Sequence, residues 1–235
     1  MGRTGCYRRF ALLSTLLSLL SDLFYPHTCP GCGEGVPGPL ALCDRCRDGV
    51  YHPRPFHPGS LGCPHLDGLF FLFDYAGAIQ EALHKAKFEK REDLLPRLAK
   101  EWQEGVAREG RFRWQLPADV ALSVTAIPTD PARRKKRGYD VPEELFRPWA
   151  QKNGYRWEPL LQRVRPSRPQ FSLSPTERKE NIQGCFGLVP GAALPDIVLL
   201  CDDICTTGAT LEEAAKVLKQ GGVKKVYGLA LASSN

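Results

Sequence analysis

Apolar runs alternate with helix-patterned stretches along most of the chain. The runs occupy residues 68–73, 120–127 and 197–201. Residues 75–108 are helical in pattern with a weaker centre, and Pro96 is expected to begin a second helix there. Another helix is expected from about Leu211. Buried strands alternating with helices predict an α/β fold with a mainly parallel sheet.

The first 25 residues show a different pattern. Apolar side chains recur at helical spacing at Phe10, Leu13, Leu17, Leu20 and Phe24, which predicts an amphipathic helix. Its apolar face either packs on the protein itself or docks on a membrane surface or a partner. A signal peptide is disfavoured because no small-x-small cleavage site follows and Asp22 interrupts the apolar stretch. The stretch is also too short before Pro26 to span a bilayer.

Four of the nine cysteines have the spacing of metal ligands. Cys29 and Cys32 form one Cys-x2-Cys knuckle, and Cys43 and Cys46 form another after a ten-residue loop. Two such knuckles complete a tetrahedral four-thiolate site, which leaves no open position and is therefore structural. We expect one Zn²⁺ per chain to fold residues 25 to about 50, which have few apolar residues. A pair of disulfides is the weaker alternative.

The cysteine count and the net charge indicate the cellular compartment and the class of partner. The cysteine count is odd, and several cysteines lie inside apolar runs, which fits a reducing cytoplasm better than a disulfide framework. Cys63 and His65 lack the partners for a second metal site and stay unassigned. A chain of 235 residues can bury a full core, and its net charge of +6 favours anionic partners. Polyphosphate, nucleic acid and acidic lipid all remain open.

The third apolar run leads into a phosphate-binding pattern. Asp202 and Asp203 end the run, and a loop of small and hydroxyl residues precedes the helix: Thr206, Thr207, Gly208, Ala209 and Thr210. Backbone amides at a helix N-terminus bind phosphate, while paired carboxylates accept hydrogen bonds from vicinal hydroxyls. An acidic turn with a threonine cap explains one of these features but not their combination. A Walker loop is excluded because no Gly-Lys-Ser/Thr tripeptide occurs.

A second candidate segment follows the strand at 120–127. That strand ends at Pro128 and Thr129, and five cations, 133–137, precede Gly138. Ligands collect at the carboxyl ends of parallel strands, so this end and Asp202 are expected to face one crevice. A mobile basic loop could then close over a pyrophosphate. A solvated charged face and a nucleic-acid contact are the alternatives.

These motifs resemble those of two related protein families. The order of apolar run, Asp-Asp and Thr-Thr-Gly-x-Thr resembles the type I phosphoribosyltransferases, whose donor is phosphoribosyl pyrophosphate (PRPP). Over almost the full length the chain also looks like a ComF protein of the ComFC type. This resemblance rests on motifs in order: the four cysteines, Lys87, Ile127-Pro128, Arg137-Gly138-Tyr139, Arg165 to Gln170, Glu177-Arg178, Asn181 and Gly184-x-Phe186.

The resemblance implies roles for individual residues. It places Asp202 and Asp203 on the ribose hydroxyls and Thr206 to Thr210 on the 5-phosphate. It assigns Lys87 and Arg137 to catalysis on the pyrophosphate side, where ligand oxygens and waters hold Mg²⁺. Further substrate contacts are expected from Pro128, Thr129, Arg133 and Arg134. The family's usual Asn-Gln is replaced here by Asp140-Val141, a departure on the acceptor side.

The resemblance also implies a biological setting. We expect an amphipathic helix over 1–25, a zinc module over 26–63 and a phosphoribosyltransferase-like domain over 64–235. The implied function is PRPP binding with Mg²⁺ in cytoplasmic DNA uptake and natural transformation, with membrane association left open. A catalytically inactive PRPP sensor, a single-stranded DNA adaptor and a nucleobase salvage enzyme remain as alternatives. Neither the acceptor substrate nor the oligomeric state follows from the sequence.

Overall fold

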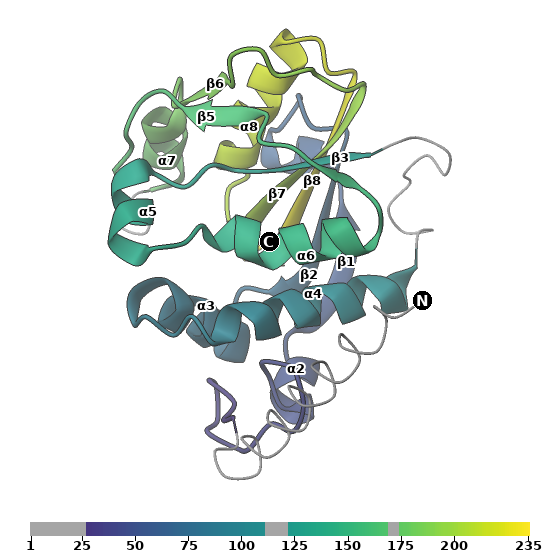
Figure 1. Cartoon of the computed structure of the whole chain (residues 1–235), viewed down its shortest axis with the longest axis vertical. Coiled ribbons are helices and arrows are strands. Elements are labelled where there is room, and N and C mark those ends of the chain that lie inside the picture. Colours follow the sequence, from purple (N-terminus) through teal and green to yellow (C-terminus); the bar gives the residue numbers. More distant parts are fainter. Residues whose placement is uncertain (1–26, 111–121, 169–173) are drawn as a thin grey trace, which may run out of the picture.

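The computed structural model describes residues 27–110, 122–168 and 174–235, so the helix expected over 1–25 lies outside the described residues. Its centre is a six-stranded sheet in the order β1-β2-β8-β7-β3-β4 (Figure 1). The strands are β1 (Tyr51–Phe56), β2 (Gly68–Asp74), β3 (Ser123–Ala126), β4 (Arg156–Trp157), β7 (Ile197–Cys205) and β8 (Lys225–Ser233). Within this sheet, β1 pairs antiparallel with β2, and the other neighbouring strands pair in parallel. The predicted α/β fold with a mainly parallel sheet is confirmed.

Helices cover both faces of this sheet. One face carries α3 (Gly77–Phe88), α4 (Leu94–Glu109) and α6 (Val141–Lys152), whereas α8 (Ala209–Gln220) packs on the other. Beside α8 lie α7 (Pro175–Ile182) and a two-stranded sheet of β5 (Leu161–Arg163) and β6 (Phe186–Leu188). The expected division of 75–108 into two helices is confirmed, with the second beginning two residues before Pro96.

Successive side chains of the central strands point to opposite faces of the sheet. Both faces are covered by helices, which explains the continuous apolar runs. In β7, Leu199 and Cys201 join the core under α3, α4 and α6, while Val198 and Leu200 join the core under α8. A strand covered on both faces needs apolar residues at every position. Helix α4 lies so close to β2 that a Cβ at Gly105 would come within 2.4 Å of a Leu72 methyl carbon. The central strands are therefore packed closely by helices on both faces.

Residues 27–50, here called the zinc segment, lie against the outer side of α3 and α4 (Figure 1). The segment contains the short helix α2 (Asp44–Asp48). Its apolar residues Val36, Ala41 and Leu42 belong to the same core as Leu83 and Leu98 of the two helices. The zinc segment and the α/β body thus share one continuous core.

Candidate functional site

The carboxyl edge of the sheet carries the two adjacent acids. Strand β3 ends at Ala126, which pairs with Cys201, and the Ile127 amide donates to the Cys201 carbonyl at 2.8 Å. Strand β7 runs on beside β8 to Cys205, so Asp202 and Asp203 lie within the strand and not at its end as expected. Pairing with β8 keeps this stretch extended. Both acids stand where β3 has left the sheet.

Lys87 contacts the second acid directly. Its Nζ lies 2.6 Å from Oδ2 of Asp203, and the two side chains are only 19% and 9% exposed. Arg137 Nε donates to the Lys87 carbonyl at 3.2 Å, and the Tyr139 hydroxyl donates to the neighbouring Ala86 carbonyl. The structure therefore brings Lys87, Arg137 and Asp203 together at the end of α3.

Asp202 has a different environment. Burial raises the pKa of its carboxyl well above the ordinary value, and the nearby Asp203 charge adds to this effect. The Asp203 amide donates to Asp202 Oδ1 at 2.8 Å. Burial favours the neutral form of this carboxyl, whereas a cation or a hydrogen-bond donor beside it favours the ionised form. Perturbed acids at a sheet edge are typical of functional sites.

Residues 206–210, here called the threonine turn, join β7 to α8. The helix begins at Ala209, so Ala209 and Thr210 lie in its first turn, slightly earlier than the expected start. Gly208 has φ of +73°, and a Cβ there would lie 2.6 Å from the Cys63 sulfur. Both facts demand glycine. The turn therefore brings a sharp bend and a helix N-terminus next to the two acids, an arrangement that suits an anion.

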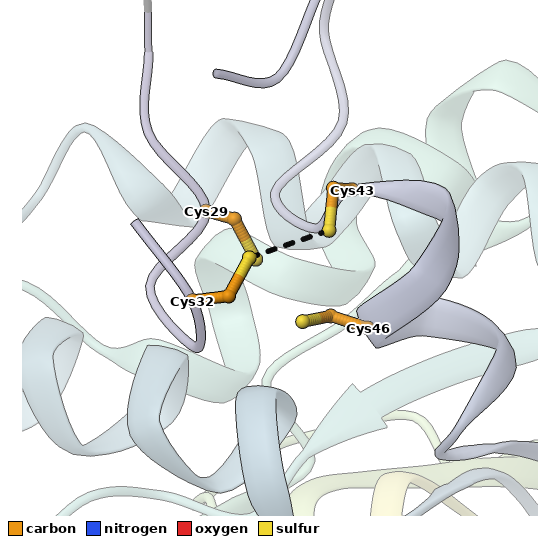
Figure 2. A group of neighbouring side chains, drawn as sticks. All are labelled: Cys29, Cys32, Cys43 and Cys46. Atoms are coloured by element: carbon orange, nitrogen blue, oxygen red, sulfur yellow. Dashed lines mark hydrogen bonds between the residues drawn. The ribbon is translucent and has the colours of Figure 1, made fainter. Parts of the chain in front are cut away.

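The four predicted zinc ligands converge in the zinc segment (Figure 2). Their sulfur atoms all lie within 4.8 Å of one another, and Cys32 Sγ is 3.6 Å from Cys43 Sγ. Zn–S bonds of about 2.3 Å in a tetrahedron separate the sulfurs by about 3.8 Å, so this set fits Zn²⁺. The backbone amide of Glu34 lowers the pKa of the Cys32 thiol to about 7, which favours the thiolate that a ligand must supply.

Comparisons with known proteins bear on the zinc cluster and on the chain as a whole. A family model described as a double zinc ribbon domain matches residues 20–58. The DNA utilization protein YhgH of Salmonella typhimurium is 28% identical over 208 residues, covering 84% of this chain and 86% of that protein. Competence protein F of Haemophilus influenzae is 28% identical over 215 residues, covering 87% of this chain and 90% of that protein. The resemblance to the ComF family is confirmed.

A shorter match points the same way. Competence protein ComFC of Streptococcus pneumoniae is 33% identical over 105 residues, or 45% of each chain. The zinc ribbon match contains all four cysteines of the cluster, so the predicted structural zinc site is confirmed. Among the described residues, no helix has the length and apolar character needed to cross a bilayer.

The basic segment 133–137 is helical and is not the mobile loop expected. Helix α5 (Pro131–Arg137) is capped by Asp130, which accepts hydrogen bonds from the amides of Ala132 and Arg133 at 3.1 and 3.3 Å. Gly138, with φ of +95°, ends it. The Asp-Pro start and the glycine end are helix signals that outweigh repulsion among the cations.

The remaining predicted contacts are held by hydrogen bonds. Arg133 donates to the Ser167 carbonyl at 3.1 Å, and the Thr129 amide donates to Asp140 Oδ2 at 3.0 Å. Arg134 lies 3.6 Å from Glu143. The departure at Asp140 thus has a structural role, since this carboxylate also caps α6 through the Glu143 amide. Its position before Val-Pro-Glu is the capping signal that could have revealed that role.

Arg163 is a site neighbour that the sequence did not single out. Its Nε donates to the Pro128 carbonyl at 2.8 Å, and its guanidinium stacks 5.0 Å from the Phe186 ring centre. Burial lowers its pKa from the ordinary value, while Asp130 and Asp202 act in the opposite direction. No nearby sequence motif indicates this role of Arg163, because the residue lies in β5, more than thirty residues after Pro128.

Cys63 and His65 lie beneath the threonine turn. Burial raises the pKa of the Cys63 thiol to about 11, and the sulfur fills the space left by Gly208. His65 Nδ1 lies 2.5 Å from Glu212 Oε1, and its amide donates to the other carboxylate oxygen at 3.1 Å. Both residues therefore fasten the β1–β2 connection to the start of α8.

The polar family motif near α7 is also structural where it is described. Glu177 forms a reciprocal capping box with Ser174. Asn181 accepts from the Arg168 amide at 2.9 Å and donates to the Arg168 carbonyl at 3.0 Å. Gln170 lies outside the described residues. These contacts hold the segment after Arg163 against α7.

Proposed function

We propose that this chain binds PRPP, together with Mg²⁺, at the carboxyl edge of its parallel sheet and acts in DNA uptake. The observation that carries the proposal is the convergence of three features on one edge. These are the acids Asp202 and Asp203, the threonine turn at the start of α8, and the cation of Lys87 on Asp203. A phosphorylated sugar with a second anionic group matches this combination of donors and acceptors.

The geometry suggests how the ligand is held. The threonine turn binds the 5-phosphate through backbone amides, and the two acids accept hydrogen bonds from the ribose hydroxyls. Lys87 then exchanges its contact with Asp203 for the pyrophosphate, with Arg137 beside it. Mg²⁺ would be held beside these carboxylates chiefly by ligand oxygens and waters, and it would screen the charge of the pyrophosphate. The acids therefore face the sugar and the cations face the leaving group.

A calorimetric titration tests the ligand. PRPP with Mg²⁺ is titrated into the wild type and into the Asp202→Asn/Asp203→Asn double variant. We expect the double variant to lose about 10- to 100-fold in affinity, because neutral amides accept hydrogen bonds from hydroxyls less strongly than carboxylates do. Asp196→Asn is the control, since Asp196 is an exposed partner of Lys224. Tight binding by the double variant would remove the site assignment.

Turnover is a separate question that a release assay answers. A phosphoribosyltransferase, including a salvage enzyme, releases pyrophosphate from PRPP when given its nucleobase or other acceptor, whereas a sensor binds PRPP without release. Displacement at the anomeric carbon depends mainly on positioning the donor and stabilising the departing pyrophosphate. Release that requires both an acceptor and Lys87 would favour the enzyme over the sensor.

The names of the similar proteins motivate the biological part of the proposal. They are a DNA utilization protein, Competence protein F and Competence protein ComFC. We infer a role for this chain in DNA uptake from this agreement. Deleting its gene should reduce uptake of labelled DNA in the host cell, and restoring the wild type should recover it. Normal uptake in the deletion strain would contradict this role.

Single-stranded DNA binding is a second candidate, favoured by helix α5. Its residues Arg134, Lys135 and Lys136 are exposed on one short helix, a surface suited to phosphate contacts. The affinity for a labelled oligonucleotide should fall steeply with salt. A Lys135→Glu/Lys136→Glu variant should bind more weakly and show a smaller salt dependence. Unchanged affinity in this variant would exclude α5 as the contact.

A further inference from the structure

A buried carboxylate joins the zinc segment to the α/β body. Glu101 lies in the middle of α4, and its side chain is only 3% exposed. An acid in such a position is costly unless every oxygen is paired. Its neighbour Glu104, one turn along the same helix, is 35% exposed and pairs with surface cations. Glu101 is therefore a specific feature of the packed face of α4.

Among the described residues, the hydrogen-bond partners of the Glu101 carboxylate all come from the zinc segment. Its Oε1 accepts hydrogen bonds from the backbone amides of Ala41 and Leu42 at 3.1 and 3.0 Å. Its Oε2 accepts from Nε of Arg47 at 2.9 Å, and the Arg47 side chain is itself only 7% exposed. Arg47 also donates to the Leu42 carbonyl at 2.7 Å. One carboxylate thus ties together both ends of a short loop.

That loop is the second zinc knuckle. Leu42 immediately precedes the ligand Cys43, and Arg47 immediately follows the ligand Cys46. Because Glu101 bonds to residues on both sides of the ligand pair, the backbone that presents these sulfurs is held by α4. These hydrogen bonds join protein groups only.

The first knuckle has weaker support from the body. Lys85 of α3 donates to the Pro30 carbonyl at 3.2 Å, and Gly31 lies against Ala78. The Cys29 amide donates to the Glu34 carbonyl at 2.7 Å, which is a contact inside the knuckle itself. Among the described contacts, no buried charge of the body binds the backbone amides of residues 29–33. The two halves of the zinc site therefore differ in how they are held.

We propose that Glu101 is a positioning residue for zinc, which sets Cys43 and Cys46 in place before the metal arrives. The α/β body then acts as a template for half of the site, and the first knuckle closes when zinc binds. A preformed half-site lowers the ordering cost of binding and raises metal affinity. The zinc segment consequently depends on α4 as well as on its own metal.

A competition titration against a chromogenic chelator tests this proposal on the full chain. Glu101→Gln keeps the size of the side chain but loses its charge, and we expect it to retain zinc about 10- to 100-fold less tightly than the wild type. Glu104→Gln is the matched control and should keep wild-type affinity. The Co²⁺-loaded Glu101→Gln protein should still give a four-thiolate tetrahedral spectrum at saturating metal, which separates weakened positioning from a lost ligand. Wild-type zinc affinity in Glu101→Gln would overturn the proposal.

Hydrogen exchange on the wild type gives a result that does not depend on a variant that folds. After zinc removal, the amides of Ala41 and Leu42 should stay protected because they donate to Glu101. The amides of Cys29 and Gly33 should lose protection, since their bonds lie within the first knuckle. Equal loss of protection at both knuckles would overturn the proposal.

Discussion

The two adjacent acids of β7 show how one sequence motif yields two chemical environments. Asp203 has a cation 2.6 Å away on α3, while burial and the Asp203 charge raise the pKa of Asp202. A raised pKa means that the folded state binds the Asp202 proton more tightly than the unfolded state does. Stability therefore falls as pH rises above the ordinary aspartate pKa towards the raised one.

Single amide variants should separate these environments. At pH 7, Asp202→Asn is expected to raise the free energy of unfolding, because an amide avoids the free-energy cost of burying an acid that is ionised in the unfolded chain at this pH. Asp203→Asn is expected to lower it, because Lys87 is left without its carboxylate. Chemical denaturation measures both changes. If Asp202→Asn loses stability at pH 7 and not at pH 4, the environment assigned to Asp202 is wrong.

Gly208 is the other position at which the structure strongly restricts the residue type. Alanine at this position meets both a left-handed backbone and the Cys63 sulfur, so Gly208→Ala should cost about 2 kcal/mol or more in the free energy of unfolding. Gly191→Ala is the control, because Gly191 has a similar φ of +75° and open space around its Cβ. Denaturant unfolding of both variants gives the comparison. Equal losses would show that the contact with Cys63 contributes nothing.

At the scale of elements, helix α3 connects the zinc segment with the carboxyl edge. Ala78 and Lys85 contact the first knuckle, and Lys87, half a turn further on, contacts Asp203. We therefore expect a change at the knuckle to shift Lys87, because both sets of contacts are made by one helix. The two candidate sites lie on opposite sides of the same element.

This connection predicts that zinc removal weakens PRPP binding. A loosened first knuckle withdraws support from α3, so affinity should fall several-fold after chelation and return when zinc is added back. Calorimetry on the chelated and reloaded protein measures the change. Lys85→Met, which removes the bond to the Pro30 carbonyl, should lower PRPP affinity in the same direction. Identical affinity with and without zinc would show that the two sites are independent.

Elements also mark the limits of prediction from sequence. The strands at 68–73 and 197–201 and the helix pair around Pro96 followed from apolar pattern, because burial on two faces leaves few polar positions. The sequence does not clearly predict helix α5, because a run of five cations is typical of an exposed loop even where an Asp-Pro start and a glycine end favour a helix. Arg163 and Glu101 could not be foreseen, since each acts on residues more than thirty positions away.

At the scale of the whole molecule, one of the two cores extends from the zinc segment to strand β7. Leu42 of the zinc segment, Leu83 of α3 and Leu199 of β7 belong to the same buried cluster. The spacing of the four cysteines predicted the zinc site, yet the sequence alone suggested a module folded by its metal. The shared core and Glu101 instead connect that segment to the sheet that carries the acids.

A crystal structure of the full chain grown with PRPP and Mg²⁺ tests the central claim most directly. We predict the 5-phosphate on the amides of the threonine turn, the ribose hydroxyls on Asp202 and Asp203, and Lys87 turned from Asp203 to the pyrophosphate. PRPP bound elsewhere on the molecule, or no PRPP at saturating concentration with Lys87 still on Asp203, would contradict the account.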